Sequence, residues 1–201
     1  MMGSLGFRFK RMYPFCDILR GSREPPMSEV KTLYDEDFVL WSKQQAEALR
    51  AAARGGSNQP LDWENLAGEI EDLGKSDRRE LGSRIREIIE HLVKLEHSRS
   101  TEPRRGWRAS IQRQRAEIDA LLKDSPSLRR EVPAIIRDET RRGGKNAVAD
   151  LDEYDELSAA GRKRLKAPSY LDLLSYTADQ ILGDWFPPEP KESPRGASRR
   201  G

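Results

Sequence analysis

Cysteine is nearly absent from this sequence, because Cys16 is the only one in 201 residues. A single cysteine cannot form an intramolecular disulfide, which excludes a disulfide-stapled secreted scaffold and is compatible with a reducing cytosol. No run of about 18 apolar residues occurs either, so no membrane-spanning helix is expected. The N-terminal residues lack the continuous apolar segment and the cleavage site of a signal peptide. These absences predict a cytoplasmic protein.

Motifs of nucleophilic and nucleotide-dependent catalysis are also missing. No serine stands in a Gly-x-Ser-x-Gly turn, and the sequence has neither a phosphate-binding loop nor a dinucleotide-binding fingerprint. Lys and Arg number 36 and Asp and Glu number 34, and the resulting net charge of +2 does not by itself indicate a nucleic-acid-binding protein. We therefore predict no cofactor, and we do not favour an enzyme.

The sequence does contain strong helical periodicity, with almost no strand-like alternation. Apolar residues at helical spacing predict helices over residues 35–54, 62–73, 76–97, 105–123 and 128–142. A capping box at Thr177 predicts one more short helix. Glycines are expected to stop two of these helices, and Gly74 is expected to end or bend the second one. The other stopping glycines are Gly55, Gly56, Gly143 and Gly144.

Residues 28–188 are predicted to form one all-α domain, a compact bundle of about five or six helices. Its second and third helices should form an antiparallel or bent pair that carries most of the core. Residues 145–169 hold a group of acids followed by a group of bases and are expected to form a mobile loop or a short helix. Residues 1–27 are predicted to be a disordered leader or a mis-assigned start, and residues 189–201 a disordered tail.

Five segments of the sequence occur in an order typical of one known family. They are YDEDFVLW (34–41), LDWENLAGEIEDLGKSDRREL (61–81), HLVKLE (91–96), GWRASIQRQRAEIDALLKDSPSL (106–128) and YTADQIL (176–182). In these segments the sequence resembles the bacterial domain of unknown function 29 family, DUF29, over about residues 32–187. The resemblance implies an all-helical domain and supplies no activity. The charged residues around 150–169 depart from the family pattern.

Carboxylates recur along residues 61–85, and a histidine follows them. Glu87 and His91 stand four residues apart, a helical spacing that could bind a metal with help from Glu64 or Glu71. However, the carboxylates near residues 62–73 point in three directions around the helix axis, and Glu87 and His91 fall beside the apolar seam. A solvated flank with ordinary ion pairs is therefore favoured, and a metal site or general base stays open as an alternative.

Arginines cluster between residues 99 and 115, where six of them accompany one acid. Arginine suits bidentate phosphate contacts, and Trp107 could stack on an unpaired base. Trp107 also shares a helical stripe with Ile111 and Ile118, which favours a core position. Charge pairing inside the domain is favoured, with a nucleic acid or an acidic protein as the alternative partner. The candidate residues are Arg99, Arg104, Arg105, Arg108, Arg113 and Arg115.

Long apolar seams and the lack of convergent catalytic groups favour a non-enzymatic protein-interaction module that binds another protein or forms a homo-oligomer. Gln114 lies on an otherwise apolar stripe, and a buried amide must be hydrogen-bonded, so we expect it to fix the register of two helices. Two alternatives stay open: a nucleic-acid-binding domain that uses residues 99–115, and a metal-dependent enzyme that uses the acidic flank.

Overall fold

The computed structural model describes residues 31–56 and 59–188. All of these except Lys31 lie in the unit Thr32–Gly201. The predictions for residues 1–27 and 189–201 concern segments outside the described residues. Within the described ranges every regular element is a helix and no strand occurs, which confirms the all-α fold.

The helices follow one another with short connections. In chain order they are α1 (Leu33–Glu36), α2 (Phe38–Arg54), α3 (Trp63–His97), α4 (Arg104–Asp124), the 3-10 helix η1 (Pro126–Arg130), α5 (Val132–Glu153), α6 (Ala159–Leu165), α7 (Pro168–Leu173) and α8 (Ala178–Leu182). The predicted capping box at the start of α8 is confirmed, since Thr177 and Gln180 form it. At the start of α2, the Asp37 side chain accepts a hydrogen bond from the Leu40 amide.

The prediction that a helix could end at Gly74 and leave two separate helices is wrong, because α3 runs unbroken for 35 residues through this glycine. Gly74 is buried against α2, and a Cβ atom at this position would overlap the Ser42 side chain. A glycine is therefore needed here for the close approach of two helices and does not end one. The predicted apolar seam from Leu81 to Leu95 is fully buried in the second half of the same helix.

The prediction that Gly143 and Gly144 end a helix is also wrong, because α5 continues to Glu153. A Cβ atom on Gly143 would lie 3.0 Å from the backbone oxygen of Arg86 on α3, and one on Gly144 would lie 2.6 Å from Leu174. Both glycines allow neighbouring chain segments to approach α5. The segment predicted as a mobile loop or short helix contains the end of α5, all of α6 and the start of α7.

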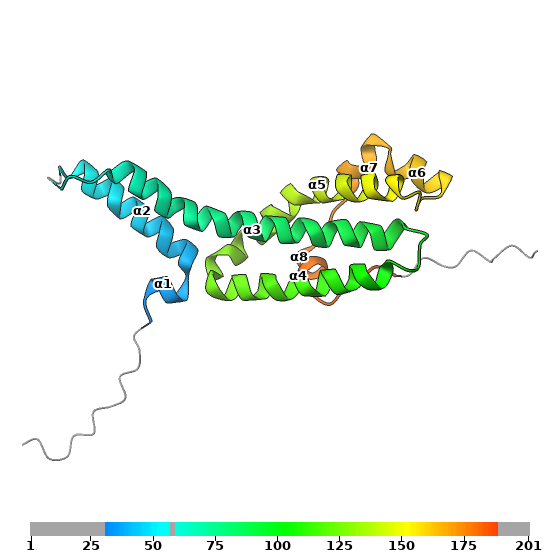
Figure 1. The fold of residues 1–201 in the computed structure, drawn as a ribbon, viewed down its shortest axis with the longest axis horizontal. Coiled ribbons are helices and arrows are strands. Elements are labelled where there is room, and N and C mark those ends of the chain that lie inside the picture. The colour runs from blue at the N-terminus through cyan, green and yellow to red at the C-terminus, as the bar shows by residue number, and fades with distance from the viewer. Residues whose placement is uncertain (1–30, 57–58, 189–201) are drawn as a thin grey trace, which may run out of the picture. The chain divides into compact units, whose positions relative to one another are not determined.

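Helix α3 is the central element of the described fold (Figure 1). Its N-terminal half packs against α2, and its C-terminal half packs against α4 and α5. The short helix α8 contacts α3, α4 and α5, and its Ile181 is fully buried among them. The large core side chains therefore gather around the second half of α3, and the first half is left in a two-helix hairpin with α2.

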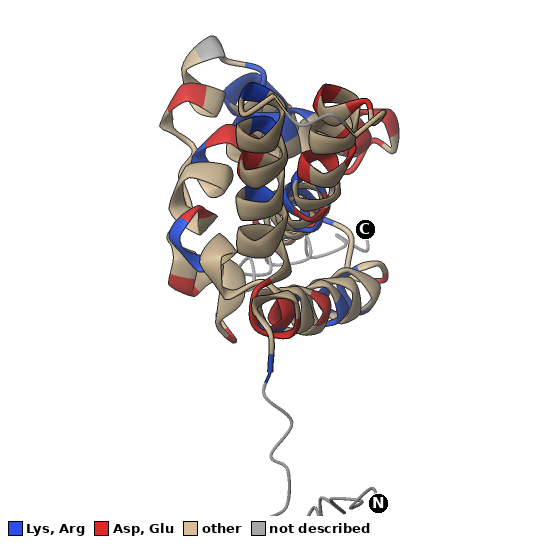
Figure 2. Cartoon of the chain, turned by 90° about the vertical axis from the view of Figure 1, so that its left-hand side faces the viewer, with Lys and Arg blue, Asp and Glu red and all other residues tan. Residues whose placement is uncertain are grey.

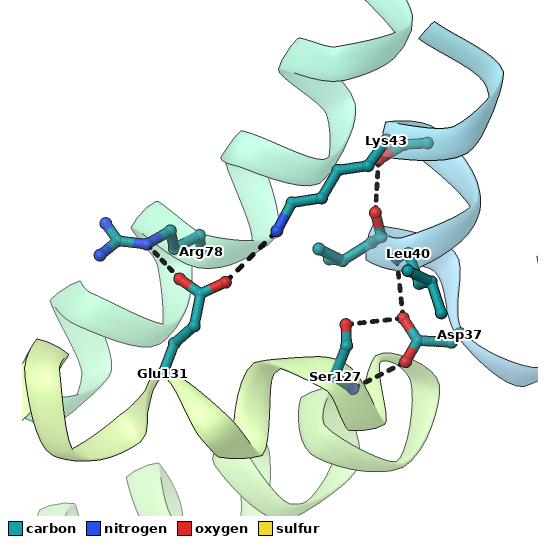
Figure 3. Close-up of polar contacts among 8 residues, drawn as sticks. Asp37, Leu40, Lys43, Arg78, Ser127 and Glu131 are labelled. Atoms are coloured by element: carbon teal, nitrogen blue, oxygen red, sulfur yellow. Dashed lines mark hydrogen bonds and ion pairs between the residues drawn. The ribbon is translucent and has the colours of Figure 1, made fainter. Parts of the chain in front are cut away.

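Polar contacts attach one end of this hairpin, the start of α2 and the facing part of α3, to η1 and the start of α5 (Figure 3). Asp37 accepts hydrogen bonds from the Ser127 amide and hydroxyl, at 2.7 and 2.9 Å. The Glu131 carboxylate pairs with Lys43 of α2 at 3.3 Å and with Arg78 of α3 at 2.6 Å. These contacts attach both helices of the hairpin, at the end that holds Asp37 and Arg78, to η1 and the start of α5.

Candidate functional site

The acidic residues near the start of α3 take part in ion pairs within the hairpin. Arg50 of α2 donates to Glu71 at 2.7 Å and lies 3.8 Å from Glu64. Lys75 lies 3.3 Å from the other oxygen of Glu71. Hydrogen bonds from Arg50 and Lys75 lower the pKa of Glu71. Glu64 and Glu71 therefore help to join α2 to α3.

Glu87 and His91 lie at the contact between α3 and α4. Ser110 and Gln114 donate hydrogen bonds to the two oxygens of Glu87, at 2.7 and 2.8 Å. Burial opposes ionisation of Glu87, but these hydrogen bonds outweigh it and lower its pKa. Burial also lowers the pKa of His91, whose Nε2 is 3.8 Å from Glu87. Gln114 additionally accepts from Arg84, so this buried amide joins α4 to α3 as expected.

The four residues considered for a metal site therefore lie in two separate pairs. Glu71 and Glu87 are 16 positions apart on one continuous helix, which corresponds to about 24 Å. Over residues 31–56 and 59–188, no group of three or more His, Cys, Asp or Glu side chains is placed to hold a metal ion. The chemistry available at each pair is charge pairing and hydrogen bonding between helices.

Two of the six candidate arginines are buried and hydrogen-bonded to backbone oxygens. Arg104 donates to the Leu95 carbonyl at the end of α3, at 2.8 Å. Arg115 donates to the carbonyls of Gln180, Ile181 and Trp185, at 2.8 to 2.9 Å. Its guanidinium also stacks over the Phe186 ring. Arg115 therefore holds α8 and the segment after it against α4.

The other four arginines do not form one row on the surface. Arg99, Arg105 and Arg113 are exposed, whereas Arg108 is half-buried over the Phe186 ring, 4.9 Å from its centroid. Basic and acidic residues lie side by side on the same helices (Figure 2). The predicted basic segment is therefore divided between the core of the fold and its surface.

The hairpin made by α2 and residues 63–78 of α3 places its small residues between the two helices. Its buried residues on α2 are Val39, Ser42 and Ala46, and those on α3 are Ala67 and Gly74. Small side chains let two helix axes approach closely, but they bury little apolar surface. The large apolar residues of the hairpin must therefore lie elsewhere.

Most of these large residues share one outer face of the hairpin, whereas Leu40, which is 38% exposed, lies on another side of α2. Leu66 is 40% exposed, Leu73 is 49% exposed and Tyr34 is 52% exposed. Phe38 and Trp41 stack on each other, and Tyr34 lies edge-on to both rings at 5.5 and 4.8 Å between centroids. We call this surface the hairpin face; its members are Tyr34, Phe38, Trp41, Leu49, Leu66, Ile70 and Leu73.

Helical geometry places these members on the same side of the hairpin. The Arg50–Glu71 ion pair marks one side. Around α3, Leu66 and Leu73 lie about 140–160° from Glu71, and around α2, Phe38 and Leu49 lie about 100–120° from Arg50. In an antiparallel pair these rotations lead to the same side, opposite the ion pair. The hairpin therefore has one charged side and one apolar side.

A polar cluster at the other end of α3 was not found from the sequence. Arg164 of α6 donates to Nδ1 of His97 at 3.1 Å. Because Nδ1 accepts this hydrogen bond, the ring proton is on Nε2, which donates to the Tyr170 hydroxyl at 3.0 Å. Burial and the neighbouring Arg164 lower the pKa of His97 from 6.5 to about 4. The imidazole is therefore neutral at pH 7.

Glu96 lies beside this histidine and accepts a hydrogen bond from the Tyr176 hydroxyl at 3.2 Å. Burial raises the pKa of Glu96, and burial also raises the pKa of both tyrosines. The residues of this cluster come from α3, α6, α7 and the segment before α8. No spacing in the sequence could bring them together, because only the tertiary fold does so.

The comparisons with known proteins agree with this all-helical architecture. The family model for the domain of unknown function DUF29 matches residues 33–186. The chain therefore belongs to the DUF29 family, as its sequence motifs predicted.

The chain is also similar to the crystal structure of an alpha-helical protein of unknown function from Rhodospirillum rubrum, with 29% identity and a TM-score of 0.56. The similarity covers 77% of this chain and 91% of that one. No curated protein matches the chain. None of the described helices combines the length and the apolar character that crossing a membrane requires. Neither the family nor this structure supplies an activity.

Proposed function

We propose that the protein is a non-enzymatic helical interaction module of the bacterial cytoplasm, and that it associates with a second copy of itself through the hairpin face. The observation that carries this proposal is the spacing of the apolar residues on α3. Trp63, Leu66, Ile70 and Leu73 follow one another at intervals of three, four and three, which is the spacing of a helix-packing seam. Leu66 and Leu73 are nevertheless exposed.

The part of the hairpin face that α2 contributes carries no charged residue along its length. Trp41, Gln45, Leu49 and Ala52 lie on the side of α2 that continues the hairpin face, and no ionisable residue occupies this stripe. On the α2 side, two copies of the face can therefore meet without burying an unpaired charge, whereas on α3 the acids Asp62 and Glu69 border Leu66 and Leu73 and would lie at the rim. An apolar hairpin is half of a four-helix bundle, and an identical hairpin related by a twofold axis supplies the other half.

The size of the face fits a dimer interface at the small end of the range. A 17-residue helix such as α2 is about 25 Å long, and two packed helices are about 20 Å wide. The face then measures about 500 Å² per copy, so that two copies bury about 1,000 Å² in total. A monomer that left such an apolar patch in water would be unusual.

Two further observations support the cellular setting of the proposal, and a third supports its non-enzymatic character. The similar crystal structure comes from Rhodospirillum rubrum, a bacterium. The single cysteine in 201 residues is compatible with a reducing compartment. The ion pairs and hydrogen bonds of Glu64, Glu71 and Glu87 join helices to one another, which favours a structural role for them.

Sedimentation equilibrium of the full chain tests the proposal. We expect the wild-type chain to dimerise at micromolar concentrations, and the variant Leu66→Glu/Leu73→Glu to sediment as a monomer, because it places two carboxylates on each copy of the face. The dissociation constant should rise at least about tenfold per substitution, or about 1.4 kcal/mol.

Leu173→Glu is the matched control, since Leu173 is 79% exposed and lies on α7, away from the hairpin. It should leave the dimer unchanged. A wild-type chain that stays monomeric up to several hundred micromolar contradicts the proposal. So does a loss of dimer in Leu173→Glu equal to that in the hairpin variant.

A further inference from the structure

A hollow opens beside the polar cluster at the C-terminal end of α3, with a volume of about 300 Å³. Glu96 of α3 lies in its wall, together with Tyr170 and Leu173 of α7. The segment that leads into α8 supplies Ser175 and Tyr176, and Trp185 follows α8. One carboxylate and three aromatic side chains therefore surround a single space.

Among the residues that the structure describes, no lysine or arginine forms an ion pair with the Glu96 carboxylate, although Arg164 lies near enough to favour its ionised form. The one basic side chain within ion-pair distance is His97, 3.6 Å away, and this imidazole is neutral at pH 7. Arg164 makes its hydrogen bond to the opposite ring nitrogen of His97, so its charge acts on Glu96 from a distance and not through direct contact. Burial still raises the pKa of Glu96, and a cation that entered the hollow and contacted the carboxylate would offset this cost of ionisation.

The aromatic residues of the hollow suit the same kind of ligand. The faces of tyrosine and tryptophan rings attract organic cations through their quadrupoles, and tryptophan does so most strongly. Tyr176 is held in place because its hydroxyl donates to Glu96, and Tyr170 is held because its hydroxyl accepts from His97. The walls are therefore positioned before a ligand binds, which reduces the entropy lost on binding.

We propose that this hollow binds a small organic ammonium ion, with its ammonium group against Glu96 and its carbon chain between Tyr170, Tyr176 and Trp185. The volume of about 300 Å³ is at the lower end of ligand sites, so the ligand is an alkylammonium of a few carbon atoms. This site is about 30 Å or more along α3 from the hairpin face, because Leu73 and Glu96 are 23 positions apart. It does not depend on self-association.

Titration of the full chain with n-butylammonium, followed by amide and indole NMR shifts, tests the proposal. We expect a dissociation constant in the millimolar range, which is typical of a ligand with about five heavy atoms. The shifting signals should be those of Tyr176, Gln180 and the Trp185 indole. Neutral n-butanol should bind at least about tenfold more weakly, since it lacks the charge that pairs with Glu96.

Glu96→Gln removes the negative charge and keeps the local structure, because the amide oxygen still accepts the Tyr176 hydrogen bond. This variant should bind n-butylammonium at least about fivefold more weakly. Glu64→Gln is the matched control at the other end of α3 and should bind like the wild type. Leu173→Lys is a second test on an exposed residue, where a lysine at the rim should compete with the ligand and weaken its binding by a similar factor.

Three results would overturn the proposal. The first is no shift at several tens of millimolar n-butylammonium. The second is equal binding of n-butanol, which would mean that the hollow takes apolar chains without regard to charge. The third is unchanged binding by Glu96→Gln, provided that its NMR spectrum away from the hollow matches that of the wild type.

Discussion

Gly74 of α3 lies directly against Ser42 of α2, so close that a Cβ atom on the glycine would overlap the serine hydroxyl oxygen. The same hydroxyl donates a hydrogen bond to the Val39 carbonyl at 2.9 Å and is buried. It cannot turn away without losing this bond. The contact therefore sets the distance between the two helices of the hairpin, and with it the shape of the hairpin face.

Gly74→Ala should destabilise the protein, although alanine is the better helix former by about 1 kcal/mol. The added methyl group must displace the Ser42 hydroxyl or separate the helices, and we expect a net loss of about 1–2 kcal/mol in the free energy of unfolding. Urea denaturation measures it. The double variant Ser42→Ala/Gly74→Ala should recover the loss, because the serine Cβ alone would be 3.5 Å away. Gly68→Ala is the control on the same helix: its Cβ would meet nothing within 4 Å, so it should be stabilising.

Sequence periodicity predicted the positions of the helices well and the role of their glycines poorly. The repeat of buried positions continues in phase across Gly74, from Ala67 through Leu81 to Ile85, which is a signal of one unbroken helix. A glycine that ends a helix and one that allows close packing have the same local sequence signature. Only the neighbouring helix distinguishes them, and this neighbour is set by the tertiary fold.

Gly143→Ala tests the second close approach, between α5 and α3. A Cβ atom here would lie 3.0 Å from the Arg86 carbonyl oxygen and 3.0 Å from the Ile89 Cγ2. A backbone oxygen inside a helix cannot move aside easily, so we expect a loss of about 1–2 kcal/mol on urea denaturation. Gly106→Ala, on α4 and with nothing within 4 Å of its Cβ, should instead stabilise the protein. Equal effects of the two substitutions would contradict this account.

Arg115→Lys should weaken the attachment of α8. The guanidinium donates to three carbonyl oxygens of residues 180–185, and a lysine ammonium cannot reach all of them from the same position. Buried carbonyls left without a donor should lower the free energy of unfolding by about 2–3 kcal/mol. Hydrogen exchange should show faster opening of α8 than of α3. Arg113→Lys, at an exposed position, should change stability by less than about 0.5 kcal/mol.

The arginines also show where prediction of the site from the sequence stopped. A cluster of six basic residues is the usual pattern of a phosphate-binding surface, and the sequence alone could not show that Arg104 and Arg115 are directed into the fold. The helical period did contain a partial signal, since Arg104, Ile111 and Arg115 fall on one face of α4 and all three are buried. The helical period could not show the position of α8, and Arg115 donates to carbonyl oxygens in and after this helix.

The titration of His97 should make stability depend on pH. Its pKa is about 4 in the folded chain, against an ordinary value of 6.5, so between these pH values the unfolded chain binds a proton that the folded chain does not. The contribution of the neutral His97 to the free energy of unfolding is fully present above about pH 6.5 and is lost as the pH falls toward 4. Its size is on the order of 2–3 kcal/mol, since the side chain is only 12% exposed.

Glu96 acts in the opposite sense, because burial raises its pKa and the folded chain therefore binds its proton more readily than the unfolded chain as the pH falls. The wild-type slope alone would mix the two effects. The measurement is therefore the difference in the free energy of unfolding between the wild type and His97→Gln, from urea denaturation at about pH 7 and about pH 4.5. On acidification from about pH 7 to about pH 4.5, we expect the wild type to lose on the order of 2 kcal/mol in the free energy of unfolding relative to His97→Gln. Parallel pH profiles of the two proteins would show that His97 is not the group that titrates.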